Sequence, residues 1–190
     1  MIILQDSFTD IEGTQLENHT PEIGSWICLG EYATITSNQM TNNYYLKSFY
    51  KANMPDYTDM TFTMKVNAIG FETIIFLARM TVSPFNAYGL QLTSANALFV
   101  RYDNGILSTL KTFSIPGMIS SLIKFAVTGS ILSAYKNGIL IDSIIDSVYS
   151  SGVAGFYFPS WGGSLAQFDD ALIEIPEVLK TDHLAMTGLH

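Results

Sequence analysis

The sequence has very little cysteine and little charge. Its 190 residues include one cysteine, Cys28, so an internal disulfide framework is excluded. Charged residues make up 14% of the chain, and nine Lys and Arg face 17 Asp and Glu, for a net charge of -8. The few basic residues are spread along the chain and form no patch for a phosphate backbone. Nucleic acid is therefore excluded as a ligand.

Long apolar runs are also missing. Ile139-Leu140-Ile141 is interrupted by Asp142, and Ile144-Ile145 by Asp146, whereas a membrane-spanning helix needs roughly 18 consecutive apolar residues. No charged and then apolar leader precedes the first expected strand, so we expect no signal peptide. We expect a protein that does not span a membrane and that is made and assembled in the cytoplasm.

Apolar residues are abundant, at 48% of the chain. A chain of this length buries roughly 70% of its unfolded surface, so a single domain with a full core is expected. Soluble surfaces usually carry about 25–35% charged residues. The low charge therefore favours burial of outer faces against other proteins, including further copies of the chain.

Alternation with a period of two predicts half-buried strands. Phe62, Met64 and Val66 share one face, and the same pattern places Tyr88, Leu90 and Leu92 together, as well as Ile123, Phe125 and Val127. No segment shows amphipathic spacing typical of a helix. The sequence predicts an all-β protein.

Turn signals separate these runs. Asn104-Gly105 and Asn137-Gly138 are typical of two-residue hairpin turns, which need positive φ at both positions. Segments 86–92, 98–102, 127–138, 155–157 and 168–170 are interpreted as one antiparallel meander. Short strands punctuated by turn residues favour a two-sheet antiparallel β-sandwich over residues 1–175. Pro176 ends the last strand, and residues 176–190 are expected to be a tail or docking arm.

Two segments resemble the concanavalin A-like jelly-roll domains, in particular the laminin-G-like modules of phage and bacterial surface proteins. The first is the opening Asp6-Ser7-Phe8-Thr9-Asp10, followed by His19-Thr20-Pro21-Glu22 and Trp26. The second is the ending Gly152-Val153-Ala154-Gly155-Phe156-Tyr157 with Phe168-Asp169-Asp170. The resemblance implies that the last strand pairs with the first. It leaves function open, because lectins, hydrolases, adhesins and virion proteins share this fold.

Catalytic motifs are absent. Hydrolases that this chain resembles carry two carboxylates across the scissile bond on one strand, as Glu-x-Asp-x-x-Glu, and no such run occurs. His19 stands in the opening loop, far along the sequence from His183 and His190, and no paired Cys or His motif suggests zinc. We expect no catalytic residues and no cofactor, with one exception.

That exception is a structural calcium ion. Calcium prefers carboxylate and carbonyl oxygens, and many members of the resembled group carry such an ion. If the first and last strands pair, Asp6 or Asp10 approaches Asp169 or Asp170. The alternative is that Asp170 occupies a bulge, because the alternation slips between Phe168 and Ile173.

Aromatic residues in loops are candidates for glycan binding, since exposed rings stack on sugar faces. Trp161, between Pro159-Ser160 and Gly162-Gly163, is the main candidate, with Tyr157, Tyr44 and Tyr45 as helpers. The alternative for Trp161 is a cover over one end of the core. Trp26 is expected to pack inside.

Three functions remain open. A chain that begins with Met1 directly before its first strand, without an export signal, favours a phage virion surface protein over a secreted module. On this hypothesis it is a non-enzymatic capsid decoration, head-fibre or tail-associated protein, oligomeric and docked on other virion proteins. The alternative is a lectin-like module that binds surface glycans, and a glycoside hydrolase is the third hypothesis.

Overall fold

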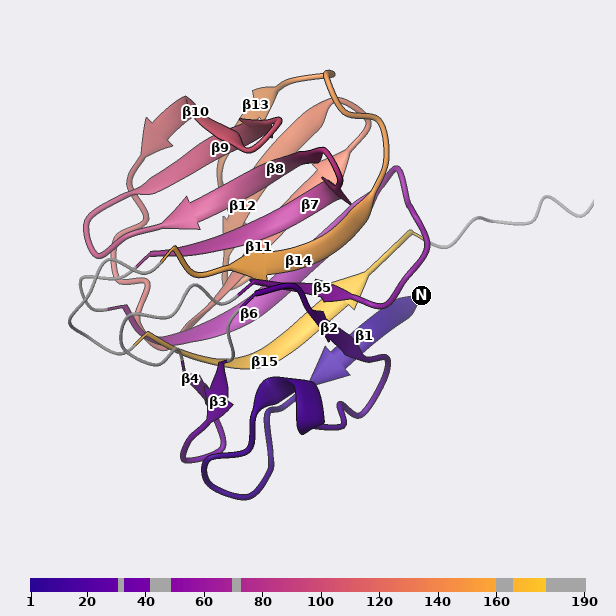
Figure 1. Ribbon diagram of the computed structural model, residues 1–190. Helices are drawn as coiled ribbons and strands as arrows, with labels where there is room; N and C mark the ends of the chain where they lie inside the picture. Colours follow the sequence, from indigo (N-terminus) through magenta and orange to yellow (C-terminus); the bar gives the residue numbers. More distant parts are fainter. Residues whose placement is uncertain (31–32, 42–48, 70–72, 160–165, 177–190) are drawn as a thin grey trace, which may run out of the picture.

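The computed structural model is a sandwich of two antiparallel sheets, which confirms the predicted fold class (Figure 1). It describes residues 1–30, 33–41, 49–69, 73–159 and 166–176. In these ranges the only helix is the 3-10 turn η1 (Leu16–Asn18), so none of their helices is long enough to cross a membrane. The predicted docking arm lies outside the described residues from position 177 onward.

Sheet A contains eight strands in the order β13-β12-β11-β6-β15-β4-β3, with β1 paired to β15. Its strands are β1 (Ile2–Asp6), β3 (Thr34–Ile35), β4 (Met40–Thr41), β6 (Met60–Ala68), β11 (Ser121–Thr128), β12 (Ile131–Lys136), β13 (Ile139–Ile145) and β15 (Gln167–Glu174). The antiparallel pairing of β1 with β15 confirms that the last strand pairs with the first.

Sheet B contains seven strands in the order β10-β9-β8-β7-β14-β5-β2. Its strands are β2 (Trp26–Cys28), β5 (Phe49–Ala52), β7 (Ile74–Val82), β8 (Phe85–Leu92), β9 (Ala97–Asp103), β10 (Ile106–Phe113) and β14 (Val153–Tyr157). The two strands that flank β14, β7 and β5, come from distant parts of the chain.

The single meander expected over residues 86–170 is wrong. β8, β9 and β10 form one meander in sheet B, and β11, β12 and β13 form a second one in sheet A. The chain changes sheet between β10 and β11, because both layers need strands to bury their inner faces. Both hairpin turns are confirmed, since Asn104, Gly105, Asn137 and Gly138 all have positive φ.

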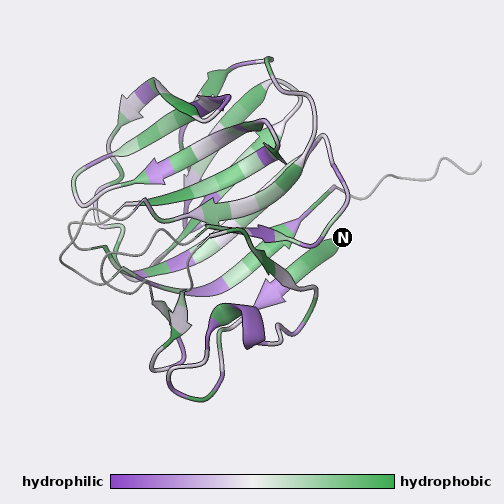
Figure 2. Ribbon diagram, viewed as in Figure 1, coloured by the Kyte–Doolittle hydropathy of each residue, from purple (hydrophilic) through white to green (hydrophobic). Residues whose placement is uncertain are grey.

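The core lies between the sheets and follows the predicted alternation. Phe62, Met64 and Val66 of β6 are buried against Tyr88, Leu90 and Leu92 of β8 and their neighbours. Trp26 is 7% exposed and packs edge-on against Phe156, with ring centroids 5.0 Å apart, so its predicted inward position is confirmed. Figure 2 shows apolar residues along the central strands of both sheets.

Glycine at position 155 is required by a close approach of two strands. A Cβ atom there would lie 2.3 Å from the carbonyl oxygen of Tyr50 on the neighbouring β5. We predict that Gly155→Ala lowers the free energy of unfolding by about 1–3 kcal/mol, because the strands must separate. Urea denaturation measures this. Gly129→Asn is the control: its φ of +55° suits Asn, nothing lies within 4 Å, and little change is expected. Equal stability of wild type and Gly155→Ala would contradict the prediction.

Candidate functional site

The outer face of sheet B is apolar, although it faces away from sheet A. Ile75 and Leu77 on β7 and Val100 on β9 are fully buried there, in a cluster separate from the main core. Gly89 on β8 stands between Leu77 and Val100 in register. Aliphatic side chains on the outside of a sheet need a cover of other side chains, because their contact with water is unfavourable.

Four aromatic rings provide this cover and enclose a pocket. Phe49 from β5, Phe85 from β8, Tyr102 from β9 and Tyr157 from β14 line a hollow of about 210 Å³ together with Gly105. We call it the aromatic pocket. The Phe49 centroid lies 5.1 Å from that of Phe85 and 5.7 Å from that of Tyr157, and Phe85 lies 4.8 Å from Tyr102. Tyr102 is buried, while the other three rings are partly exposed.

Local sequence explains how the rings are held. A Cβ atom at Gly89 would collide with the side chains of Ile75 and Val100, at 2.7 Å and 2.8 Å, so glycine lets these two side chains pack over β8. The Asn104-Gly105 turn returns the chain to β8, where the Gly105 N–H donates to the Phe85 carbonyl oxygen at 2.7 Å. The turn therefore fixes one rim of the aromatic pocket.

The aromatic pocket is electrically neutral. Burial raises the pKa of Tyr102, with a smaller effect from the nearby Tyr157, and burial also raises the pKa of Tyr157. Both phenols therefore keep their protons at neutral pH. Their hydroxyls are the only polar side-chain groups among the described residues that line the pocket.

One predicted glycan-binding residue, Tyr157, lies in the aromatic pocket. Trp161, Tyr44 and Tyr45 lie outside the described residues. The sequence interpretation missed Phe49, Phe85 and Tyr102, which reach the pocket from three other strands. Phe49 and Tyr102 each stand on the parity opposite to an inward aromatic residue of the same strand, Tyr50 of β5 and Phe99 of β9, and an aromatic residue at such a position is the signal that could have indicated them.

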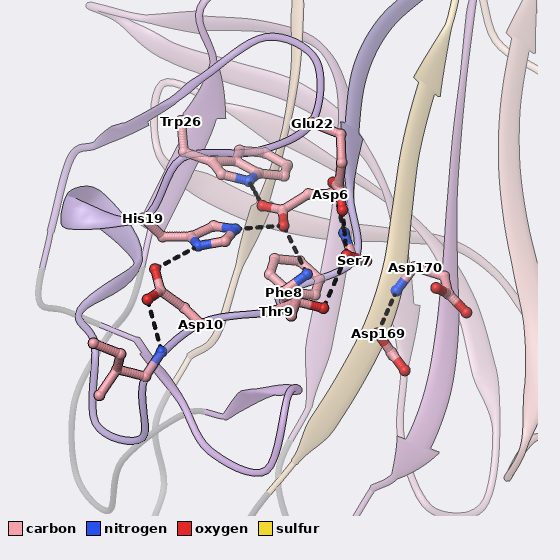
Figure 3. A network of polar contacts seen from close by, with 11 residues as sticks. Asp6, Ser7, Phe8, Thr9, Asp10, His19, Glu22, Trp26, Asp169 and Asp170 are labelled. Atoms are coloured by element: carbon pink, nitrogen blue, oxygen red, sulfur yellow. Dashed lines mark hydrogen bonds and ion pairs between the residues drawn. The ribbon is translucent and has the colours of Figure 1, made fainter.

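The structure places the four predicted calcium ligands in two separate groups. Asp6 is fully buried and its carboxylate accepts three hydrogen bonds, from the backbone N–H of Phe8 at 2.8 Å, from Trp26 Nε1 at 2.7 Å and from His19 Nε2 at 2.8 Å. Asp10 binds the other ring nitrogen, His19 Nδ1, at 3.0 Å. Figure 3 shows the imidazole held between these two carboxylates.

Asp169 and Asp170 point away from this cluster (Figure 3). Both lie near Lys65 Nζ, at 3.8 Å and 3.9 Å. Asp170 has a φ of 52°, and the register of β15 with β6 shifts between Asp169 and Leu172. The predicted bulge at Asp170 is confirmed. Among the described residues no group of three or more His, Cys, Asp and Glu is arranged to hold a metal ion.

The Asp6–His19–Asp10 cluster ties the opening loop to β1 and β2. Burial is the largest influence on Asp6 and raises its pKa. Burial is also the largest influence on His19 and lowers its pKa, but hydrogen bonds and charges of Asp10 and Asp6 together outweigh it, so the net pKa is raised. Both ring nitrogens donate at once only in the imidazolium form.

This raised pKa makes stability depend on pH. The folded protein holds the His19 proton more tightly than the unfolded chain does, so the contribution is fully present below the ordinary pKa of 6.5. We predict that it declines as the pH rises through the raised folded pKa and then levels off. Urea unfolding across this range measures it, with His19→Gln as the reference that lacks the titrating ring. Parallel pH profiles for wild type and His19→Gln would contradict the prediction.

Comparison with known proteins indicates the fold. No protein-family model and no curated protein sequence matches the chain, whereas solved structures do. Carbohydrate-binding module CBM66 from Bacillus subtilis has a TM-score of 0.68 at 17% identity, over 81% of this chain and 98% of that one. A protein of unknown function with a galectin-like fold, from Bacillus subtilis, has a TM-score of 0.64 at 10% identity, over 91% and 95%.

An enzyme also matches. The beta-glucanase of Bacillus licheniformis has a TM-score of 0.60 at 12% identity, over 88% of this chain and 100% of that one. Identities this low show the fold alone. The chain is a jelly-roll β-sandwich of the architecture shared by this carbohydrate-binding module, this galectin-like protein and this glucanase, in agreement with the concanavalin A-like resemblance.

Proposed function

We propose that the protein binds glycans through the aromatic pocket on the outer face of sheet B. The observation that carries this proposal is the convergence of Phe49, Phe85, Tyr102 and Tyr157 around one open hollow. Aromatic faces stack on sugar rings, and aromatic-lined hollows with a few polar groups are typical of ligand sites. The similarity to a carbohydrate-binding module and to a galectin-like fold supports the same function.

The ion pairs that the described carboxylates form favour glycan binding over glycoside hydrolysis as the function. Glycoside hydrolysis needs two carboxyl groups that face each other across a sugar. In the described part of the chain the clustered acids are engaged by cations: Arg101 binds Asp103 and Asp146, and Lys111 binds Asp142. The Arg101 and Tyr149 contacts lower the pKa of Asp103, which is unfavourable for a general acid.

The virion hypothesis stays a prediction. Its support is the low charge of the chain, which favours contact with other proteins or copies. The structural similarities favour the glycan-binding alternative, because the matched proteins include a carbohydrate-binding module. Assembly on a virion, self-association and a structural calcium ion are separate properties that glycan binding neither requires nor excludes.

A glycan array tests the proposed function. We predict that the wild-type chain binds a defined set of glycans and that Phe85→Leu or Tyr157→Ala weakens this binding about fivefold or more, as loss of one stacking ring does. Tyr135→Ala is the matched control, since Tyr135 lies on sheet A under Lys124, 4.2 Å from the ring centroid, and does not line the pocket. Binding lost only in Trp161→Ala would place the site in that loop instead. Turnover of a β-glucan by the wild-type chain would favour the hydrolase.

A further inference from the structure

The aromatic pocket offers many ring faces and few hydrogen bonds. In the part of the chain that the structure describes, four of the five lining residues are aromatic, and the fifth is Gly105, whose N–H already donates to the Phe85 carbonyl oxygen. A neutral sugar ring carries several hydroxyl groups, each of which loses water on entering a site and needs a new partner. The two phenol hydroxyls can satisfy only some of them. The lining therefore suits a group that needs aromatic faces more than hydrogen bonds.

An alkylated ammonium group has these needs. The face of an aromatic ring is electronegative, and a cation within about 6 Å of the ring centroid is attracted to it. Neighbouring rings in the pocket touch one another, with centroids 4.8–5.7 Å apart, so a cation on the open side of the hollow can approach two adjoining rings at once. Phe49 stands at 72° to Phe85 and at 69° to Tyr157. Rings at such steep angles form adjoining walls instead of a single flat platform.

The surrounding charge favours a cation as well. No Lys, Arg or His is among the residues that line the pocket in the described structure. The chain carries a net charge of -8, which attracts cations from solution and repels acidic sugars. Because burial keeps both phenols protonated, the rings attract a cation without any charge of their own that would bind water strongly.

We propose that the glycan unit that enters the aromatic pocket carries an ammonium group. This inference depends on the proposed glycan-binding function and names its ligand class: either an amino sugar with a free amine or a glycan that carries a choline substituent. The hollow of about 210 Å³ is smaller than the roughly 300–1,000 Å³ of pockets for drug-sized ligands. One head group therefore enters, and the remaining sugar units lie outside on the face of sheet B.

Calorimetric titration of the full chain with matched ligand pairs tests the proposal. The first pair is choline and dimethylbutanol, its neutral isostere with carbon in place of nitrogen. The second pair is glucosamine and N-acetylglucosamine. We expect choline or glucosamine to bind at least about tenfold more tightly than its neutral partner, because only the cation gains the electrostatic attraction of the ring faces in addition to packing against them. Binding of glucosamine, but not of choline, should weaken as the pH rises and the amine loses its proton.

Matched variants locate the binding. Phe85→Leu and Phe49→Leu keep an apolar side chain but remove a ring face, and each should weaken binding of the cation about fivefold or more. Tyr157→Phe keeps the ring and should bind normally. Phe113→Leu is the control, since Phe113 stacks on Phe99 away from the pocket. Circular dichroism and thermal melts of each variant show that it is folded before its affinity is compared.

The outcomes separate the inference from the function beneath it. Equal binding of the neutral and charged partners, lost in Phe85→Leu, would overturn the ammonium inference and leave glycan binding intact. Choline binding without binding of any glycan on the array would support the cation site and overturn the glycan function. Undiminished binding of the cation in both leucine variants would overturn the inference, and tight glucosamine binding alone would identify the amino sugar as the source.

Discussion

Sheet B is apolar on both faces, and this constraint shapes the rest of the molecule. Its inner face forms the main core with sheet A, while its outer face carries Ile75, Leu77 and Val100, all fully buried. Antiparallel sheets commonly leave one face in water. Here seven consecutive residues of β7, from Ile74 to Met80, are buried. A second, smaller layer is therefore needed, and four aromatic side chains supply it.

This cover explains why a pocket forms at all. Planar rings from β5, β8, β9 and β14 meet at angles of 48–72° and enclose a hollow between them. Beside it, Gly89 lets the side chains of Ile75 and Val100 close over the middle of β8. The main core, by contrast, is closed by two sheets that interdigitate, as in other sandwiches. The aromatic pocket therefore lies where side chains cover the apolar outer face of sheet B and no further layer of backbone from the described residues does.

The sequence predicts what depends on local pattern and misses what depends on strand order. Alternation in β6, β8 and β11, the two Asn-Gly turns and the bulge at Asp170 are local, and all are confirmed. The change of sheet between β10 and β11 is not visible in either strand. The same holds for Phe49 and Phe85, which lie 36 positions apart on β5 and β8, two strands that are not neighbours in sheet B, although their rings meet in the aromatic pocket. The pairing of the first and last strands suggests Asp6 as a calcium ligand, whereas its partners in the structure are His19 and Trp26, which only the fold brings to it.

On the proposed function the rings have two roles, as a cover and as ligand contacts, and the two roles respond differently to substitution. Removing a whole ring uncovers the aliphatic floor, so an alanine variant loses stability by a cavity term of about 3–5 kcal/mol for a fully buried Phe and less for a partly exposed one. Replacing Phe85 by leucine keeps most of the apolar volume and removes only the electronegative face. If the rings served as cover alone, leucine would be tolerated at every one of these positions with no effect on any ligand. The rings of Phe49, Phe85 and Tyr157 line an open hollow and are partly exposed to water, which does not stabilise a cover, and this residual exposure supports the proposed use of the outer face of sheet B as a binding surface.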